Sequence, residues 1–376
     1  PFFVTYLYCH VYVKKKVGSS FSFDCFTCYT PSVIMDSLLS REIITLDSSN
    51  IRQYIHSKRI LITGAAGSIG SELLRQIISF GPKQVMAIDQ SEIGIYSLQG
   101  AMNVHPLVTC QIANITDKES MEHIFHSFNP QVVFHAAAYK HVCLLETQPE
   151  IAVKNNIIGT KILADIAIST QVEKFIFVST DKAVNPIGIM GISKRLSELY
   201  LLALNQRNSR TQFVTTRFGN VLGSSGSVFH VFKNCIKKNL PIPISHPDTT
   251  RYMMAIPEAV QLVLESAAIG GGGEIMIFNM GEPIVIIELA KRMHRHFHPG
   301  KCLPEILIVG LKPGEKLHEE LQHDYEKVIH EHQQKMRIIK PNLQELPNAF
   351  HNIDEINKAL TSVPVPQLSK YLKQLL

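Results

Sequence analysis

The sequence predicts an α/β fold, a doubly wound parallel sheet joined to a smaller C-terminal lobe, and three observations lead to this prediction. A short apolar strand over residues 59–64 is followed by a glycine turn and an amphipathic helix. Strand-like and helix-like runs then alternate up to about residue 206, which indicates a parallel sheet with helices on both faces. The chain has 376 residues, of which 45% are apolar, so it can bury one large core or two moderate ones.

The first turn carries the pattern Gly64-x-x-Gly67-x-x-Gly70, between the strand RILITG and the helix SELLRQIISFG. Glycines at this spacing permit a tight turn and bring a pyrophosphate close to the N-terminus of the helix, where free amides favour negative charge. The turn therefore predicts a dinucleotide site with contacts from Gly64, Gly67, Ser68, Ile69 and Gly70.

Asp89 ends the second strand, QVMAID. A carboxylate at this place hydrogen-bonds a ribose 2′-hydroxyl and repels a 2′-phosphate, so the sequence favours NAD over NADP. The alternative is that Asp89 caps the following helix, a role that is open to Gln90 and Ser91 as well.

Further elements continue the alternation. We expect strands over 107–113, 131–138 and 174–180, and helices over 151–168 and 193–206. The small residues Ala136, Ala137 and Ala138 at a strand end leave room for a cofactor over the carboxyl edge of the sheet. Tight helix packing is the competing explanation for this alanine run.

The segment STDKAVNPIGIMGISK, residues 179–194, follows a strand and carries the catalytic candidates. Asp181 and Lys182 are adjacent, so they can supply an acid and a base for proton transfer. Met190-x-x-x-Lys194 stands where a dehydrogenase-type enzyme normally has Tyr-x-x-x-Lys, and a thioether cannot accept a hydroxyl proton as a phenolate would. The alternatives are a capped turn with an exposed lysine and, for Met190, an inactive enzyme.

The chain resembles the extended short-chain dehydrogenase/reductase superfamily, and within it the CapD-like branch of nucleotide-sugar 4,6-dehydratases. Eight blocks between about Leu38 and about Leu321 carry the resemblance, in this order: ITGAAGSIGSEL, HAAAYKHV, NNIIGT, STDKAVNP, MGISKR, RFGNVLGSSGSV, HPDTTRYMMAIPEA and KPGEKLHEEL. The resemblance implies a Rossmann-type domain with bound NAD. It also implies conversion of UDP-N-acetylglucosamine to a 4-keto-6-deoxy sugar nucleotide for surface polysaccharide or glycan synthesis. Larger, membrane-anchored members carry Met in place of the catalytic Tyr, as this chain does at Met190.

A 4,6-dehydration oxidises C4, eliminates water across C5 and C6, and reduces C6 on one bound NAD. Our hypothesis makes Asp181 the acid for the C6 hydroxyl and Lys182 the base for the C5 proton. Burial and the charges of Lys194 and nicotinamide are expected to keep Lys182 partly neutral. We expect Thr180 to hydrogen-bond the C4 hydroxyl and Lys194 to bind the nicotinamide ribose. The C4 proton passes to Asp181 or to water, and the sequence does not decide between them.

Substrate contacts are expected from the second half of the chain. Asn220 follows a strand, and the loop 223–226 can approach a diphosphate. By resemblance, the substrate side also includes Lys140, the phosphate partners Arg251 and Lys312, and Glu315 as the acceptor for the uridine ribose hydroxyls. For each charged residue the alternative is a solvated surface side chain.

Several positions depart from the family pattern. Asn114 stands where an Asp usually faces the adenine, Cys143 where Pro is usual, and Asn279 where Asp is frequent. Lys312 replaces an Arg, which keeps the charge but loses the bidentate fork. An Asn carbonyl still accepts a hydrogen bond from an adenine amine, so Asn114 remains among the expected cofactor contacts.

Four parts describe the expected organisation. They are 1–54, an N-terminal extension of uncertain structure; 55–218 with about 252–280, the NAD-binding domain; 219–251 with about 281–340, the substrate-binding lobe; and 341–376, a helical tail. The apolar run over 1–13 is shorter than the ~20 residues of a membrane span. We therefore expect membrane attachment only through an anchor upstream of this run. A single Cys25-x-x-Cys28 is weak evidence for zinc.

The composition limits the expected partners. The formal net charge of +5 comes from 37 basic and 32 acidic residues spread along the chain, so we expect no nucleic-acid partner. Seven cysteines favour a reducing compartment, and the resemblance implies a cytoplasmic protein, at the inner face of the cell membrane when anchored. His294, His296 and His298 lack further ligands at metal spacing, so no metal is expected.

The helices over 151–168 and 196–206 are long and apolar, which suits the pair through which relatives form homodimers. Two other function classes stay open. One is a UDP-sugar C4 epimerase on the same fold, against which the Asp181–Lys182 pair argues, because epimerisation needs no acid at C6. The other is a non-catalytic NAD-binding assembly protein, which Met190 and the Asn replacements favour.

Overall fold

The computed structural model of the chain describes residues 37–102, 105–207, 210–300, 302–303, 305–341 and 365–375. The apolar run over 1–13 and the Cys25–Cys28 pair lie outside these residues, as does most of the expected tail. Within the described ranges we find no helical segment with the length and hydropathy that a bilayer span requires. The same ranges contain no cluster of three or more His, Cys, Asp or Glu side chains arranged to hold a metal ion.

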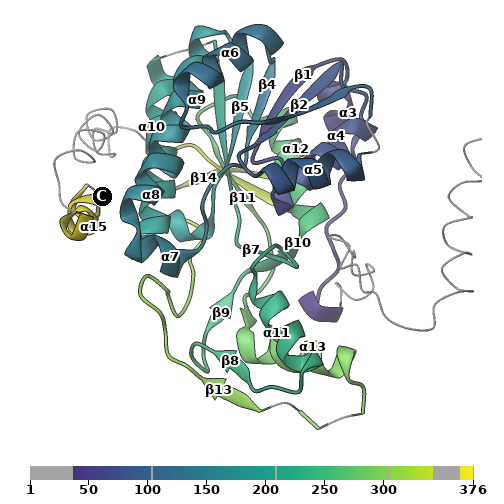
Figure 1. Cartoon of the computed structure of the whole chain (residues 1–376), viewed down its shortest axis with the longest axis vertical. Helices are drawn as coiled ribbons and strands as arrows, with labels where there is room; N and C mark the ends of the chain where they lie inside the picture. Colours follow the sequence, from purple (N-terminus) through teal and green to yellow (C-terminus); the bar gives the residue numbers. More distant parts are fainter. Residues whose placement is uncertain are drawn as a thin grey trace, which may run out of the picture. The chain divides into compact units, whose positions relative to one another are not determined.

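A nine-stranded, mostly parallel sheet forms the centre of the described chain (Figure 1). Its strands are β1 (Arg59–Thr63), β2 (Gln84–Asp89), β3 (Val108–Ile112), β4 (Val132–His135), β5 (Lys174–Val178), β6 (Gln212–Arg217), β11 (Ile275–Phe278), β14 (Val328–His332) and β15 (Met336–Ile339). The order is β14-β15-β11-β6-β5-β4-β1-β2-β3, with β15 antiparallel to both β11 and β14. The order reverses between β1 and β4, and ligands of doubly wound sheets bind at such a switch point. The predicted fold class is confirmed.

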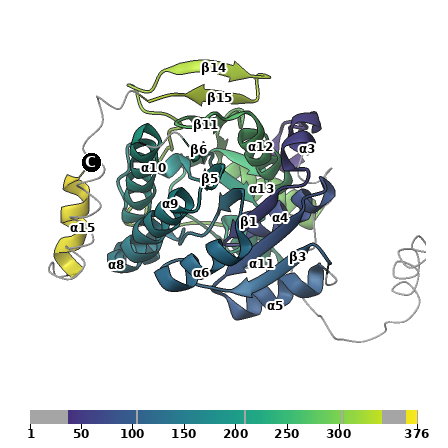
Figure 2. The ribbon, with the colours of Figure 1, turned by 90° about the horizontal axis from the view of Figure 1, so that it is seen from above.

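Helices cover both faces of this sheet, as the view from above shows (Figure 2). One face carries α6 (Lys118–Phe128), α7 (Val142–Thr147), α8 (Pro149–Ala152), the π-helix η1 (Val153–Ile158), α9 (Gly159–Ser169) and α10 (Ile189–Arg207). The other face carries α3 (Ser49–Ile55), α4 (Ser68–Ser79), α5 (Glu92–Ala101) and α12 (Ile256–Ile269). Because both faces are covered, the central strands read as continuous apolar runs rather than alternating ones.

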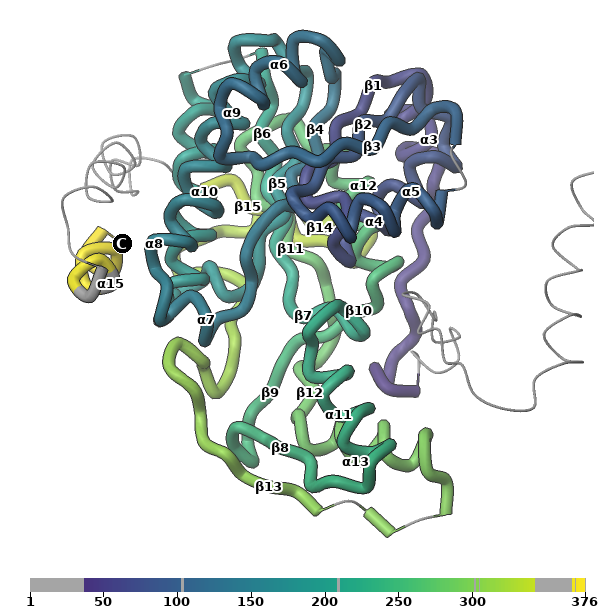
Figure 3. The backbone as a smooth tube through the Cα atoms, in the orientation of Figure 1, coloured from purple at the N-terminus to yellow at the C-terminus, as the bar shows by residue number. Residues whose placement is uncertain are grey.

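A smaller lobe lies at one end of the sheet (Figures 1 and 3). It is built from β7 (Asn220–Leu222), β8 (Ile242–Ile244), β9 (Thr250–Arg251), β10 (Met253–Ala255), β12 (Ile284–Val285), β13 (Ile306–Ile308), α11 (Val228–Lys237) and α13 (Ile286–Phe297). Three two-stranded pairs hold it together: β7 with β10, β8 with β13, and β9 with β12. The expected boundaries of the domains stay a prediction, but β14 and β15, expected in this lobe, extend the large sheet instead. Ile339 of β15 is buried against Ile275 and Ile277 of β11, which explains the placement.

Part of the expected N-terminal extension packs on the sheet. Ile51 and Ile55, one turn apart in α3, are fully buried on the face that carries α12. Arg41 pairs with the buried Glu258 at the start of α12, with 2.6 Å between Nη1 and Oε1. At the other end of the chain, α15 (Val365–Gln374) contacts α8 and α10 and buries Leu368 and Leu372.

A buried ionic network joins the sheet to α10. Arg217, at the end of β6, donates to Glu198 of α10 (2.8 Å) and to Glu326 (2.7 Å), and all three side chains are fully buried. Arg195 donates to Glu198 at 2.9 Å, and the Ser179 hydroxyl, directly after β5, donates to the same carboxylate at 2.6 Å. Burial by itself opposes ionisation, but the charges of Arg217 and Arg195 lower the pKa of Glu198 to about 2. The network therefore holds charged groups that a dry interior would otherwise exclude.

Replacing Glu198 by Gln should destabilise the protein strongly, because it leaves two buried guanidinium groups short of one counter-charge. We expect the free energy of unfolding, measured by urea denaturation, to fall by about 3–5 kcal/mol. The control is Glu122→Gln, which removes a solvent-exposed pair with Lys118 and should cost no more than about 1 kcal/mol. Equal losses in the two variants would contradict the role of the network.

Candidate active site

The glycine turn after β1 is shaped by close contact with the end of β4. Gly64 has a φ of +69°, and a Cβ added there would lie 2.6 Å from the backbone nitrogen of Ala137. A Cβ on Gly70 would lie 2.1 Å from the carbonyl oxygen of Gly64. A side chain therefore fits at neither position, and the turn can stay tight beneath the N-terminus of α4.

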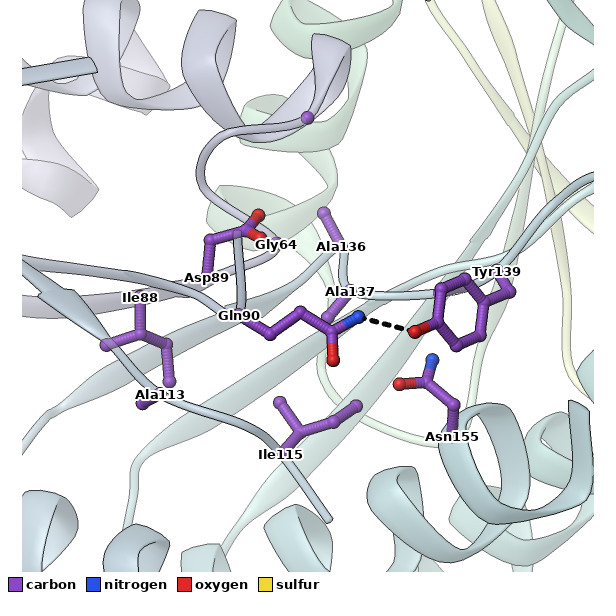
Figure 4. Close-up of a pocket in the computed structure, with 12 residues that line it drawn as sticks. Gly64, Ile88, Asp89, Gln90, Ala113, Ile115, Ala136, Ala137, Tyr139 and Asn155 are labelled. Carbon is purple, nitrogen blue, oxygen red and sulfur yellow. Dashed lines mark hydrogen bonds between the residues drawn. The ribbon is translucent and has the colours of Figure 1, made fainter. Parts of the chain in front are cut away.

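A groove runs over this turn at the carboxyl edge of the sheet (Figure 4). Of the predicted cofactor residues, the groove is lined by Gly64, Gly67, Asp89, Ala136 and Ala137. Figure 4 shows Gln90 and Tyr139 joined across it by a hydrogen bond of 2.8 Å. Most of the lining residues are glycine, alanine or isoleucine, with a few polar side chains among them, which suits the flat rings and the pyrophosphate of a dinucleotide.

Asp89 is fixed toward the glycine turn. Its Oδ2 accepts a hydrogen bond from the Ala66 backbone at 3.1 Å, and its Oδ1 accepts one from Ser91 at 2.9 Å. The residue that caps α5 is Ser91, whose hydroxyl accepts from Gly94. The structure thus separates the two alternatives for Asp89: the carboxylate lines the groove, and a neighbour caps the helix.

The other predicted cofactor residues have varied surroundings. The Ser68 hydroxyl accepts a hydrogen bond from the Ser225 backbone at 3.0 Å, which links the turn to the loop after β7. Ile69, in the first turn of α4, is partly buried and packs against the apolar core. Asn114 is exposed and its carbonyl accepts two hydrogen bonds from Thr116, so Ala113 and Ile115, rather than Asn114, line the groove.

Two asparagines of the π-helix η1 contribute to the groove although the sequence did not single them out. Asn155 lines the groove, and Asn156 accepts from the Tyr139 backbone nitrogen (2.9 Å) and donates to its carbonyl (3.0 Å). Isolated π turns are frequent at functional sites. The NNIIGT block carried the signal, but a π turn has no periodicity of its own from which to predict it.

The catalytic candidates gather after β5. Asp181 Oδ1 accepts hydrogen bonds from Thr180 Oγ1 at 2.8 Å and from Lys182 Nζ at 3.0 Å. Lys182 also donates to Asn220 at 3.0 Å, so a residue expected on the substrate side contacts the candidate acid–base pair. Asp181 Oδ2 is buried without a partner among the described residues. A Cβ on Gly219 would lie 3.0 Å from this oxygen, so a glycine lets the chain pass close to it.

Lys182 differs from its expected state. Burial lowers the affinity of the amine for a proton, but the carboxylates of Asp181 and Glu319 outweigh burial and raise the pKa of Lys182 above its ordinary value. Glu319, whose Oε1 lies 3.6 Å from Nζ, was not among the predicted residues. The expectation of a partly neutral Lys182 at rest is therefore corrected: two carboxylates keep it an ammonium ion.

Met190 and Lys194 occupy successive turns of α10, which begins at Ile189 rather than at the predicted Ser193. Met190 is buried and lines a small pocket together with Lys182 and Glu319. Lys194 is buried with its Nζ 3.8 Å from the centroid of the Phe177 ring, and this burial lowers its pKa to about 7.

The remaining substrate candidates fall into one pair and two separate residues. Arg251 and Glu315 form an ion pair, with 3.1 Å between Nη2 and Oε1, and Arg251 also donates to the carbonyls of Leu317 and Lys316. Lys140 donates to Ser224 of the 223–226 loop at 3.5 Å. Lys312 is exposed, and its backbone nitrogen donates to Glu315.

The chain is similar to proteins of polysaccharide biosynthesis. A family model described as "Polysaccharide biosynthesis protein" matches residues 60–341. The probable polysaccharide biosynthesis protein EpsC of Bacillus subtilis is 43% identical over 333 residues, which cover 85% of this chain and 55% of that protein. The capsular polysaccharide biosynthesis protein CapD of Staphylococcus aureus is 43% identical over 79% of this chain and 51% of its own length. The chain thus spans about half the length of these two relatives.

A protein of Rickettsia rickettsii named UDP-glucose 4-epimerase is 35% identical over 70% of this chain and 77% of its own length. Among solved structures, Pen from Bacillus thuringiensis has 32% identity and a TM-score of 0.71, covering 77% of this chain and 91% of that one. DesIV from Streptomyces venezuelae, a dTDP-glucose 4,6-dehydratase solved with NAD, has a TM-score of 0.63 at 20% identity, covering 70% of this chain and 88% of that one. At this identity DesIV shows a shared fold.

Replacing Asp89 by Asn should weaken NAD binding and reduce the preference for NAD over NADP, because the amide neither attracts a ribose hydroxyl as strongly nor repels a 2′-phosphate. A lost charged hydrogen bond corresponds to a loss of about 10-fold or more in affinity, which calorimetric titration of both cofactors can measure. Asp117→Asn, at the cap of α6, is the matched control because Asn caps as well as Asp. An unchanged preference in Asp89→Asn would contradict the assignment.

Proposed function

The chain belongs to the polysaccharide biosynthesis protein family, and we propose that it is an NAD-dependent 4,6-dehydratase of UDP-N-acetylglucosamine or a similar UDP-hexosamine. One observation carries the proposal: the carboxylate of Asp181 and the amine of Lys182 lie 3.0 Å apart at the end of β5, beside Thr180. Elimination of water needs an acid and a base that reach neighbouring atoms of one substrate. An adjacent pair in a single turn provides this arrangement.

The residues around the glycine turn fit a dinucleotide. The missing side chain at Gly64 leaves a cradle against Ala137, and Asp89 presents a carboxylate to the groove. When bound, NAD would accept hydride from C4 and return it to C6, so that it is not consumed. Gly64, Gly67, Asp89 and the Ala136–Ala137 strand end would hold it, and Lys194 would bind its ribose.

Asp181 is suited to act as the acid for the C6 hydroxyl. Its Oδ1 accepts from Thr180 and Lys182 and is the oxygen that a proton passed on by Thr180 would reach, whereas its buried Oδ2 has no partner among the described residues. Thr180 contacts Asp181 directly, so it can pass the C4 hydroxyl proton to this carboxylate. This route takes over the task of the tyrosine that dehydrogenase-type enzymes carry at the position of Met190. The proton taken from the C4 hydroxyl then leaves with the C6 oxygen as water.

The lobe below the sheet supports recognition of a nucleotide sugar. We propose that Arg251, Lys312 and Lys140 neutralise the diphosphate and that Glu315 accepts the uridine ribose hydroxyls. The Arg251–Glu315 ion pair keeps both side chains oriented, since Arg251 is also anchored to backbone carbonyls. On this proposal, Lys140 from the sheet domain and Arg251 and Lys312 from the smaller lobe would hold the diphosphate together.

A UDP-sugar C4 epimerase is the second candidate, and the similarity to a protein named UDP-glucose 4-epimerase favours it. An epimerase returns hydride to C4 and loses no water, so it has no use for an acid at C6. The Asp181–Lys182 contact is the observation that ranks the dehydratase first. The third class is a non-catalytic NAD-binding assembly protein, which Met190 favours. Such a protein would convert no nucleotide sugar, whereas a dehydratase or an epimerase would.

We further propose that the protein works as a homodimer in polysaccharide or glycan synthesis at the inner face of the cell membrane. The dimer would form over α8, η1, α9 and α10. Since α15 contacts α8 and α10, a partner would pack beside α15 or take its place. Light scattering of the full chain should give twice the mass of one chain, and a single-chain mass at working concentration would overturn the dimer.

The function is tested by incubating the protein with NAD and UDP-N-acetylglucosamine in deuterated water. We expect a product lighter by one water, with solvent deuterium at C5. Asp181→Asn keeps the acceptor oxygen but cannot deliver a carboxyl proton, so water loss should slow by about 10²–10⁴-fold, while Asp117→Asn should leave the rate unchanged. An isomer of unchanged composition would mean epimerisation, and near-normal turnover of Asp181→Asn would remove Asp181 from the mechanism.

A further inference from the structure

Glu319 is a buried carboxylate beside Lys182 that has no part in the roles assigned so far. Its Oε1 lies 3.6 Å from Lys182 Nζ, and its side chain is only 3% exposed. Its Oε2 is buried and has no hydrogen-bond partner among the described residues. Glu319 also lines the small pocket that contains Lys182 and Met190. A buried carboxylate oxygen without a donor costs free energy, so Glu319 is a candidate for a functional role.

The charged groups around Glu319 come from several parts of the chain. They are Lys182 and Asp181 after β5, Arg251 of β9, and Lys316 in the same segment as Glu319. Burial and the charge of Asp181 raise the pKa of Glu319 against the attraction of Lys182, Arg251 and Lys316. Arg251 is already paired with Glu315, and Lys316 donates to Glu320 and to the Val184 carbonyl. Lys182 is therefore the cation with which Glu319 can exchange a proton.

The proposed dehydration has to place two protons before water can leave. One is the C4 hydroxyl proton, which passes through Thr180 to Asp181. The other is the proton on Lys182, because an ammonium ion cannot act as the base at C5. Once Asp181 holds the first proton, it cannot take the second. The site contains two buried carboxylates within reach of Lys182, Asp181 at 3.0 Å and Glu319 at 3.6 Å.

We propose that Glu319 is the acceptor of the Lys182 proton and so converts the ammonium ion into the amine that removes hydrogen from C5. This inference rests on the proposed function. One N–H bond of Lys182 breaks, and an O–H bond forms on Glu319. The C5–H bond then breaks, its proton goes to Lys182 Nζ, and its electron pair forms the C5–C6 double bond as the C6–O bond breaks. Asp181 gives its proton to the departing hydroxyl, and water leaves.

The remaining steps restore the starting state. Lys182 gives one of its three exchangeable protons to C5 when C6 is reduced, so C5 takes up label from the solvent, and Glu319 returns its own proton to Lys182. Asp181 has gained the C4 hydroxyl proton and lost it as water, so it ends as a carboxylate. All protons are accounted for without a further donor, and the reaction needs no tyrosine at Met190.

Glu319→Gln tests the inference because it preserves the shape of the side chain and removes its ability to take a proton. Two readouts separate the steps: reduction of bound nicotinamide in a single turnover, which reports C4 oxidation, and solvent deuterium at C5 of the sugar. We expect C5 labelling and product formation to fall by about 100-fold or more while nicotinamide reduction stays close to wild type. Glu320→Gln is the matched control, since this neighbour is half-exposed and bonded to Asn185 and Lys316. It should leave both readouts unchanged.

Two results would overturn the inference alone. One is C5 labelling near the wild-type rate in Glu319→Gln, and the other is equal loss of both readouts in a variant that still binds NAD and melts normally. If Glu319→Gln does not fold, Glu319→Asp replaces it: slower C5 labelling with intact nicotinamide reduction would support the inference, and equal slowing would oppose it. Failure of the wild-type protein to release water would instead overturn the proposed function and this inference together.

Discussion

The rest of the site depends on the ion pairs that two buried carboxylates, Glu198 and Glu326, form with the Arg217 guanidinium. Arg217 ends β6, directly before the turn that leads to Asn220. Glu198 also holds Ser179, the residue before Thr180. Because the network ties the ends of β5 and β6 to α10 and to the segment around residue 326, it holds the segment that carries Asp181 and Lys182 and the segment that leads to Asn220. Buried ionic networks of this kind hold the residues that they join in place, rather than adding much to the free energy of unfolding.

The ionic network around Arg217 also affects the chemistry of the carboxylates beside Lys182. Buried polar groups normally find hydrogen-bond partners, and leaving one without a partner costs about 1–3 kcal/mol. Asp181 Oδ2 and Glu319 Oε2 both stay unpartnered among the described residues, in two carboxylates that lie within 3.6 Å of the Lys182 ammonium ion. A flexible site would relax until these oxygens were satisfied. A fixed one can keep both carboxylates able to take a proton, Asp181 from the substrate through Thr180 and Glu319 from Lys182.

The sequence predicted the parts of the protein that depend on local pattern. The strand, turn and helix around Gly64 follow from neighbouring residues, and so does the placement of Asp89 at a strand end. The raised pKa of Lys182 could not be predicted, because it is a balance between burial, the adjacent Asp181 and Glu319. Glu319 lies far away in the sequence and reaches the site only through the fold. The sequence block around Glu319 offered two adjacent carboxylates, Glu319 and Glu320, and no periodicity to say which one is buried. The joining of β15 to the main sheet is likewise a long-range pairing.

The central claim is that a single bound cofactor carries hydride from C4 to C6 of one sugar while the protein residues remove water. The most direct test supplies UDP-N-acetylglucosamine with deuterium at C4 in ordinary water and locates the label in the product by nuclear magnetic resonance. We expect the label to move to the C6 methyl group of a 4-keto sugar, without exchange into the solvent. Label that remains at C4 of an isomeric product would contradict it and assign the protein to the epimerases.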